Sequence, residues 1–228
     1  MDSSCLDNLV DFTIIIPIYN GSCYIKSFCL KAKKVLKKTG KKYELIFVDD
    51  GSTDNTYADL LDEQKKDASF KVIRLTLNQG QQLALTQGLK QATGKVVIIM
   101  DDDQEFALDY IDAILDKIKE GYDFVLLWRQ NRNIFIFRKI CSWAIGLLIS
   151  AMVQKRIHDF GGIKAFGNQG ASLLYERSSV LKMIKQLKCL TVSEIKINDG
   201  SCGYSRYSFK KLLQLFFQIL GALIKPDC

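Results

Sequence analysis

Proline, histidine and paired cysteines are scarce in this 228-residue sequence, which has two prolines, one histidine, and seven cysteines without a C-x-x-C spacing. The few prolines argue against long linkers between domains. One histidine and scattered cysteines argue against a zinc site. Irregularly spaced cysteines also argue against a disulfide framework, so we expect free thiols in a reducing cytoplasm.

Long hydrophobic runs are absent as well. The longest charge-free runs, residues 140–154 and 212–224, are shorter than the roughly 18–20 residues that cross a bilayer. Each follows a pair of cations, which is typical of an amphipathic helix in a membrane interface. A buried amphipathic core helix explains the same pattern equally well. The acidic segment 1–12 lacks the basic flank and apolar centre of a secretion signal, so we predict a cytoplasmic protein.

Glycine motifs that cradle phosphates are also missing. No G-x-G-x-x-G follows the first apolar run, and neither Gly40-Lys41 nor Gly94-Lys95 completes a G-x-x-x-x-G-K-[S/T] loop. A dinucleotide-binding or P-loop fold therefore loses its main support.

Apolar runs alternate with amphipathic segments in the first half of the chain. Hydrophobic residues make up 48% of the sequence and charged residues 25%, as in folded globular proteins. Continuous apolar runs predict buried parallel strands at residues 12–19, 43–50, 70–77 and 95–101. Helical spacing predicts helices at residues 24–39, 55–67 and 81–93, with Asp54 as the N-cap of the second. We therefore predict an α/β fold in a single domain, residues 1–228, with a mostly parallel sheet and helices on both faces.

Polar residues follow each predicted strand, at residues 17–20, 49–54, 77–80 and 101–104. The carboxyl ends of parallel strands meet at one edge of an open sheet, where ligands bind. We therefore expect these residues to lie together. Carboxylates in place of backbone amide nests predict a divalent cation, Mg²⁺ or Mn²⁺, that holds a phosphorylated ligand. Asp49 and Asp50 are candidates to hydrogen-bond a base or ribose hydroxyls.

Four segments carry a resemblance to a known family: TIIIPIYN (13–20), FVDDGSTDNT (47–56), the stretch from LNQG to DDDQ (77–104) and GYSRYSFKKLLQL (203–215). In this order they resemble family 2 glycosyltransferases of the GT-A fold, in the dolichol-phosphate mannosyltransferase-like branch that transfers sugars to polyprenyl phosphates. The resemblance implies a Rossmann-like sheet. It also implies a nucleotide-sugar-binding half at 11–128, an acceptor-side half at 129–209 and an apolar C-terminal helix at 210–228.

The resemblance also implies roles for individual residues. The donor, a UDP- or GDP-sugar, would contact Pro17, Tyr19, Asp49, Asp50, Ser52, Asp101 and Asp102. The metal ligands would be Asp101, Asp103 and Gln104. The branch commonly has Asp-x-Asp-Leu-Gln, whereas Gln104 here follows Asp103 directly. Asp101 and Asp103 are therefore the favoured metal pair, and Asp102 is the alternative if the motif is shifted by one residue.

Catalytic roles are implied for Asp103, Arg129, Arg138 and Asp159. Arg129 and Arg138, with Arg132 between them, would neutralise phosphates, and Ser142 keeps the R-x-x-x-S spacing. Asp159 would lie in a loop near the acceptor. Departure of a nucleoside diphosphate builds negative charge, which a cation and arginines stabilise.

The second half of the chain lacks an adjacent pair of acidic residues, and this bears on the chemical class of the acceptor. An alcohol needs a general base, and family members that act on hydroxyls usually carry an adjacent acidic pair. Here Asp159 and Glu176 stand singly. A phosphate, with a second pKa near ~6, is already anionic at neutral pH. The sequence therefore favours inverting transfer to a polyprenyl phosphate at the cytoplasmic membrane face.

The positive charge of the chain also favours the cytoplasmic membrane face. The net charge is +7, and residues 31–42 contain seven lysines, a pattern that anionic lipid headgroups attract. The lysines are not interleaved with aromatics, so we predict no nucleic-acid partner. The chain ends before the membrane-spanning helices of many branch members, so a peripheral enzyme and a need for a membrane-protein partner both stay open.

Two other functions remain open. One is transfer to a hydroxyl of a growing cell-surface polysaccharide. The other is a non-catalytic nucleotide-sugar-binding subunit. It is favoured by Gly200, which stands where the family has an arginine, and by the shortened DDDQ motif at residues 101–104.

Overall fold

The structure is a computed structural model that describes residues 10–129, 146–147, 150, 157, 163–167 and 190–197. The elements in chain order are β1 (Phe12–Ile18), α1 (Ile25–Lys38), β2 (Tyr43–Asp49), α2 (Thr56–Lys66), β3 (Phe70–Arg74), α3 (Gln81–Gln91), β4 (Val96–Ile99), the 3₁₀ helix η2 (Glu105–Tyr110), α4 (Ile111–Lys119), β5 (Phe124–Arg129), β6 (Lys164–Phe166) and β7 (Val192–Ile197).

One sheet with the strand order β3-β2-β1-β4-β6-β5-β7 organises the fold. β1 pairs in parallel with β2 and β4, and β2 pairs in parallel with β3. The short β6 runs antiparallel to both of its neighbours, β4 and β5. β1 and β4 are buried along their whole length, which explains why their sequences are continuous apolar runs. The mostly parallel sheet confirms the predicted α/β class.

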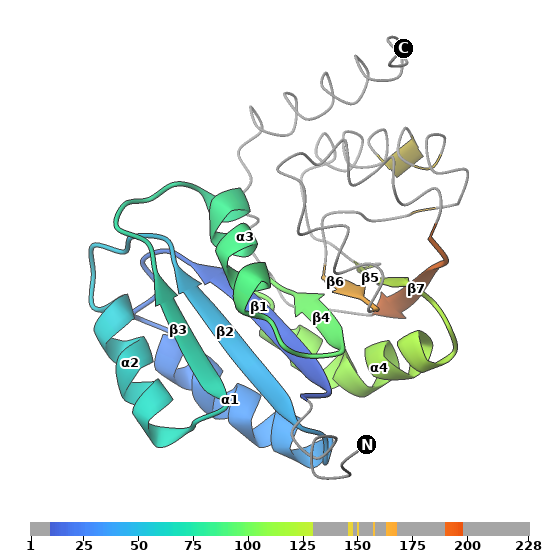
Figure 1. The fold of residues 1–228 in the computed structure, drawn as a ribbon, viewed down its shortest axis with the longest axis horizontal. Helices are drawn as coiled ribbons and strands as arrows, with labels where there is room; N and C mark the ends of the chain where they lie inside the picture. Colours follow the sequence, from blue (N-terminus) through green and yellow to red (C-terminus); the bar gives the residue numbers. More distant parts are fainter. Residues whose placement is uncertain are drawn as a thin grey trace, which may run out of the picture.

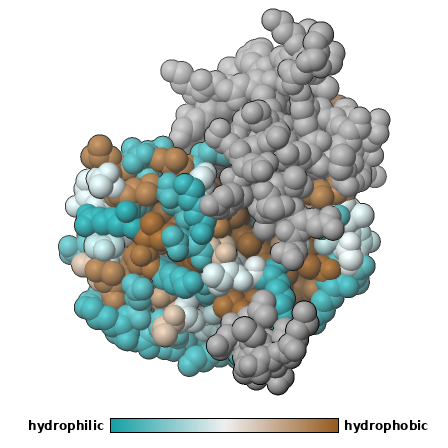
Figure 2. Space-filling view, viewed as in Figure 1, coloured by the Kyte–Doolittle hydropathy of each residue, from teal (hydrophilic) through white to brown (hydrophobic). Residues whose placement is uncertain are grey.

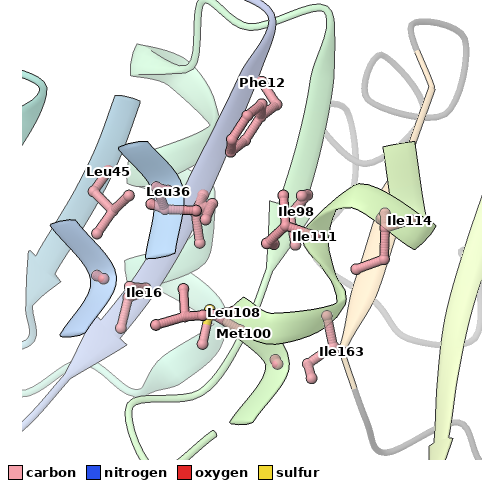
Figure 3. Packing of buried hydrophobic residues seen from close by; sticks show 14 of the residues in the cluster. Phe12, Ile16, Leu36, Leu45, Ile98, Met100, Leu108, Ile111, Ile114 and Ile163 are labelled. Carbon is pink, nitrogen blue, oxygen red and sulfur yellow. The ribbon is translucent and has the colours of Figure 1, made fainter. Parts of the chain in front are cut away.

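Helices cover both faces of the sheet (Figure 1). On one face, α3 packs through Ala84 onto Ile15, Ile46 and Val48. On the other face, α1, α2, η2 and α4 enclose the larger core, where Leu36, Leu108 and Ile114 lie against strand residues such as Ile16 and Ile98 (Figure 3). Alternate residues of β1 therefore pack against the helices on opposite faces of the sheet, as the two-residue period of a strand requires.

The predicted strands and helices of the first half are all present. The largest difference is in the strand predicted at 70–77, which ends at Arg74. Leu77 instead lies in a loop with 72% of its surface exposed. The N-cap residue of α2 is Asn55, although the Asp54 carboxylate, the predicted cap, does accept the Thr56 backbone N–H at 3.0 Å.

Two cysteines lie in the described part of the chain, and both are free thiols: Cys23 is exposed and Cys29 is buried. Within the described ranges, every helix is too short or too polar to cross a bilayer. On the face shown in Figure 2, hydrophilic and hydrophobic residues are interspersed over the described part of the surface. The apolar segments 140–154, in most of its length, and 212–224 lie outside the described residues, and the division into domain halves stays a prediction.

Candidate active site

The carboxyl ends of β1, β2, β3 and β4 meet at one edge of the sheet because these four strands are parallel. The segments that follow them hold the polar residues of the predicted site, as expected for an open α/β sheet. Tyr19 is 40% exposed at this edge, whereas Pro17 is buried inside β1.

Hydrogen bonds join the loop after β1 to the loop after β2. The Asn20 backbone N–H donates to Ser52 Oγ at 2.9 Å, and Asn20 Oδ1 accepts the Thr53 N–H at 2.9 Å. The Gly21 N–H donates to Thr56 Oγ1 at 2.8 Å. Asn20 has a positive φ of 54°, a conformation that asparagine tolerates better than most residues. The two motifs therefore form one connected rim, and Ser52 supports it from a buried position.

Asp49 is completely buried at the end of β2. Its Oδ1 accepts the Ser52 backbone N–H at 3.0 Å. Its Oδ2 lies 3.5 Å from Arg74 Nε, a separation that gives ion pairing rather than a good hydrogen bond. The Arg74 guanidinium in turn covers the Tyr57 ring at 4.4 Å. Asp49 therefore combines a fixed orientation with an oxygen that has no hydrogen-bond partner among the described groups.

Asp50 holds the loop that precedes α3. Its two carboxylate oxygens accept the backbone N–H groups of Gln79 and Gly80 at 2.8 and 2.9 Å. Gly51 has a φ of +68°, and a Cβ there would lie 2.5 Å from the carbonyl carbon of Leu77. The loops after β2 and β3 thus touch through their backbones. Asp50 organises this edge, and its direct contact with a nucleotide stays a prediction.

The three aspartates after β4 lie in different environments. Asp101 Oδ1 accepts a hydrogen bond from Gln81 Nε2 at 2.5 Å, and its Oδ2 accepts one from Gln104 Nε2 at 3.3 Å. Asp102 is only 5% exposed and accepts a hydrogen bond from the Tyr24 hydroxyl. Asp103 is exposed. Asp102 is thus directed into the protein, Asp101 is partly buried and only Asp103 is exposed. The assignment of Asp101 and Asp103 as the metal pair stays a prediction.

Electrostatics at Asp101 test whether a cation fits. Burial raises the pKa of Asp101, and the carboxylates of Asp103 and Asp102 add to this against the opposing ammonium of Lys164. Closely spaced carboxylate oxygens are ligands that hard divalent cations prefer, and such a cation would relieve their repulsion. Among the described residues, no three carboxylate, histidine or cysteine side chains gather as a ready metal cage. The donor set fits an ion held by one or two carboxylates and by substrate phosphates.

Gln104 has a different environment from the one expected of a metal ligand. It is 2% exposed, and its Oε1 accepts the Asp101 backbone N–H at 3.3 Å. Both ends of the Gln104 amide therefore contact Asp101. The geometry supports Gln104 as a brace for Asp101, and its direct metal contact stays a prediction.

Several predicted residues fall beyond what the structure describes. Arg129 is the last residue of β5. The predicted residues Arg132, Arg138, Ser142, Asp159, Glu176 and Gly200 lie outside the described residues. Sequence reasoning missed Tyr24, Gln81 and Lys164, which contact or face the aspartates. Only Gln81 had a usable signal, because it opens the helix that follows a predicted site loop.

The sheet and its loops resemble solved structures of the GT-A fold. Glucosyl-3-phosphoglycerate synthase from Mycobacterium tuberculosis, in complex with Mn²⁺, UDP and glucosyl-3-phosphoglycerate, matches with a TM-score of 0.68 and 17% identity over 96% of this chain and 81% of that chain. TarS from S. aureus matches with a TM-score of 0.58 and 21% identity over 96% of this chain and 40% of that chain. At these identities the likeness concerns the fold, which is GT-A.

Sequence comparison identifies the family. The profile of Glycosyl transferase family 2 matches residues 13–184. The undecaprenyl-phosphate 4-deoxy-4-formamido-L-arabinose transferase of Pectobacterium atrosepticum is 31% identical over 226 residues, which cover 96% of this chain and 69% of that protein. The transferase of the same name from Pectobacterium carotovorum is 30% identical with the same coverage. The chain belongs to glycosyl transferase family 2, and it is a glycosyltransferase.

Proposed function

We propose that this glycosyltransferase transfers a sugar from a nucleotide-sugar donor to a polyprenyl phosphate at a membrane surface. The observation that carries this proposal is the 31% identity, across 96% of the chain, to a transferase named for undecaprenyl phosphate. The carboxylate edge of the sheet supports the donor half of the reaction. Asp159 and Glu176 stand singly in the sequence and do not form the adjacent acidic pair that is usual in members acting on hydroxyls. The sequence therefore favours a phosphate over a hydroxyl acceptor.

The reaction needs no proton transfer from the acceptor. An oxygen of the polyprenyl phosphate, already anionic near neutral pH, attacks the anomeric carbon of the donor sugar. The bond from that carbon to the diphosphate oxygen breaks, and its electron pair leaves with the nucleoside diphosphate. Attack from the face opposite the leaving group inverts the anomeric centre.

The chain's residues position the donor and balance the developing charge. The exposed Tyr19 directly follows Ile18, which pairs with the buried Asp49, so Tyr19 and Asp49 would contact the base and ribose. Asp50 and Ser52 hold the loops around them, and Pro17, which is buried in β1, is proposed to line the same pocket. Arg129 and Arg138 are proposed to neutralise the phosphates, and Asp159 to lie near the acceptor. Positive groups that face the diphosphate where its charge develops lower the barrier.

Asp101 and Asp103 are the residues that would hold a divalent ion, Mg²⁺ or Mn²⁺, with Gln104 bracing Asp101. When bound, such an ion neutralises the diphosphate as it leaves. These two carboxylates would orient it, and Asp102, directed toward Tyr24, would stay outside its coordination shell.

The basic outer side of α1 supports a membrane location. Lysines along one flank of this helix pair with carboxylates, as Lys26 does with Asp59 at 2.8 Å and Lys33 with Asp67 at 3.0 Å. Lys34, Lys37 and Lys38 are exposed. Each lysine near an anionic bilayer contributes about 1 kcal/mol of attraction. A contact with a separate membrane protein remains compatible with this proposal.

The test combines donor binding and transfer. UDP, GDP and their sugars are screened by thermal shift with Mn²⁺ or Mg²⁺, and nucleoside diphosphate release is then followed with undecaprenyl phosphate in detergent. Asp103→Ala should reduce release on the order of 100-fold, because it removes an outward carboxylate. Asp109→Ala, at an exposed position of η2, is the matched control. Release that survives both chelator and Asp103→Ala would contradict the metal site, and release only with a hydroxyl acceptor would contradict the phosphate acceptor.

A further inference from the structure

Tyr24 and Asp102 form a contact between α1 and the segment that follows β4. Tyr24 directly precedes α1, and its hydroxyl donates a hydrogen bond to Asp102 Oδ2. The two residues are 78 positions apart in the sequence. Asp102 is 5% exposed, so this carboxylate has left bulk water. A buried carboxylate needs hydrogen-bond donors to offset its lost hydration.

The Tyr24 ring is itself held in place. A Cβ at Gly21 would lie 2.7 Å from the Tyr24 hydroxyl oxygen and 2.8 Å from Cζ, so the ring packs directly against the glycine backbone. The Tyr24 N–H donates to the Gly21 carbonyl at 3.1 Å, and Ser27 Oγ donates to the Tyr24 carbonyl at 2.7 Å. These contacts therefore hold the Tyr24 hydroxyl in a fixed position next to Asp102.

Three consecutive carboxylates offer more than one way to bind a cation. Asp101 is braced by Gln81 and Gln104, and Asp103 is exposed. Asp102, if it turned outward, would rotate the backbone that carries Asp101 and Asp103 and so change the spacing of their carboxylates. The hydrogen bond from Tyr24 opposes that rotation, because the rotation would break the bond between the phenol hydroxyl and the carboxylate.

We propose that Tyr24 is a positioning residue that holds Asp102 inside the protein and so leaves Asp101 and Asp103 as the metal-binding pair. This inference rests on the proposed function, since it presumes a divalent ion at these aspartates. It assigns to Tyr24 an effect on metal affinity that acts only through Asp102.

The direct test measures Mn²⁺ affinity without turnover. Free Mn²⁺ is titrated by electron paramagnetic resonance against the full chain with saturating UDP. Tyr24→Phe removes only the hydroxyl. Asp102 should then turn outward in most of the population, and the Mn²⁺ dissociation constant should rise about tenfold because only the remaining fraction keeps Asp101 and Asp103 in place. In an Asp102→Ala background the same substitution should change nothing further, because no buried carboxylate is left to turn outward.

Two more variants separate positioning from direct coordination by Asp102 and from a general loss of stability. Asp102→Asn keeps an oxygen that accepts from Tyr24 and should keep the wild-type Mn²⁺ affinity; a tenfold loss would make Asp102 a ligand and overturn the proposal, even if Tyr24→Phe failed to fold. Thr13→Val removes a buried hydrogen bond to Glu44 at the far edge of the sheet. It should lower the melting temperature and leave the Mn²⁺ affinity unchanged.

The outcomes also separate this inference from the proposed function. A wild-type chain that binds no Mn²⁺ with UDP would overturn the metal site, and the role of Tyr24 with it. Wild-type binding that Tyr24→Phe leaves unchanged would overturn the role of Tyr24 alone. An equal loss from Tyr24→Phe in the wild-type and Asp102→Ala backgrounds would show general loosening and would overturn it as well.

Discussion

Glu44 is a buried carboxylate at the end of the sheet opposite the candidate site. Its Oε1 accepts hydrogen bonds from Thr13 Oγ1 at 2.5 Å and from the Thr93 backbone N–H at 2.6 Å. Its Oε2 contacts the Lys71 ammonium. The Thr13 hydroxyl oxygen also accepts the Gly94 N–H at 2.9 Å. One side chain of β2 therefore ties β1, β3 and the turn before β4 together.

This network makes stability depend on pH. Burial of Glu44 raises its pKa, but the Lys71 ammonium and the hydrogen bonds from Thr13 and Thr93 outweigh burial and leave the pKa below the ordinary value of 4.5. The folded state therefore binds this proton less well than the unfolded state does. The stabilisation is complete above the ordinary pKa and is lost as the pH falls through the lower folded value.

Glu44→Gln should consequently cost about 1–3 kcal/mol of unfolding free energy near neutral pH, and the cost should shrink as the pH falls below 4.5. Urea denaturation of both proteins, from about pH 7 to about pH 3, measures this difference. Glu120→Gln, at an exposed residue that pairs with Lys117, should show a difference below about 1 kcal/mol at every pH. A pH-independent cost for Glu44→Gln would contradict the lowered pKa.

Gly51 and Gly40 form a natural pair for testing backbone contact at the site. Both have positive φ, +68° and +65°, but a Cβ at Gly51 would collide with Leu77 and Asn78, whereas nothing lies within 4 Å of a Cβ at Gly40. Gly40→Ala should cost about 1–2 kcal/mol for the conformation alone. Gly51→Ala should cost more and should also weaken UDP binding, measured by calorimetry, because the loop held by Asp50 must shift. Equal effects of the two substitutions on binding would contradict this.

At the scale of elements, α3 lies unusually close to the sheet at Gly88. A Cβ there would lie 2.5 Å from Ile15 Cγ2 and 3.1 Å from Val48 Cγ2. Alanine is favoured over glycine in a helix by about 1 kcal/mol, but forcing a methyl group into a packed interface costs about 1–3 kcal/mol. The second effect should be the larger because both neighbours are β-branched strand residues with little freedom to move.

Gly88→Ala should therefore lower stability despite its gain in helix propensity, by about 1–2 kcal/mol. Since α3 begins at Gln81, which bonds Asp101, a displaced helix should also weaken Mn²⁺ binding. Chemical denaturation and Mn²⁺ titration measure the two effects. Gln87→Ala, one position earlier in the helix, is the control and should change neither by much. A stabilised Gly88→Ala protein would show that the interface has room.

The sequence predicted the elements of the first half well because each signal there is local. The run of β1 is apolar at every position but one, and the apolar residues of α1 recur at helical spacing. β6 has only three residues and enters the sheet between β4 and β5. No local pattern announces such a strand, because its position depends on partners far along the chain. The segment that ends at Leu77 was predicted as strand for a related reason: Leu77 is apolar but exposed, and no local pattern shows that it leaves the core.

The candidate site was predictable in its location and less so in its contacts. Four polar segments after four parallel strands had to meet at one edge. Which aspartate faces outward depends on side chains that no spacing connects, such as Tyr24 for Asp102 and Gln81 for Asp101. Asp50 is an example. Its carboxylate was predicted to hydrogen-bond a nucleotide, whereas its two oxygens accept the backbone N–H groups of Gln79 and Gly80.

Charge is the property of the whole molecule that bears on location. The chain carries a net charge of +7, which attracts it to any anionic surface, but an oriented contact requires the charge to be concentrated on one side. The exposed lysines of α1, Lys34, Lys37 and Lys38, supply such a concentration. On α2, by contrast, Lys65 and Lys66 pair with Asp62 and Glu63, so their charge is locally balanced.

Two triple variants with the same change in net charge can separate position from total charge. Lys34, Lys37 and Lys38 are replaced by glutamate in one, and the exposed Lys65, Lys66 and Lys90 in the other. In sedimentation with vesicles rich in phosphatidylglycerol, the α1 variant should lose on the order of 100-fold in affinity, about 1 kcal/mol for each lysine removed, and the α2–α3 variant much less. Wild-type binding should also weaken steeply as salt shortens the screening length. Equal losses in the two variants would mean that net charge alone governs attraction, and α1 would then have no special place at the membrane.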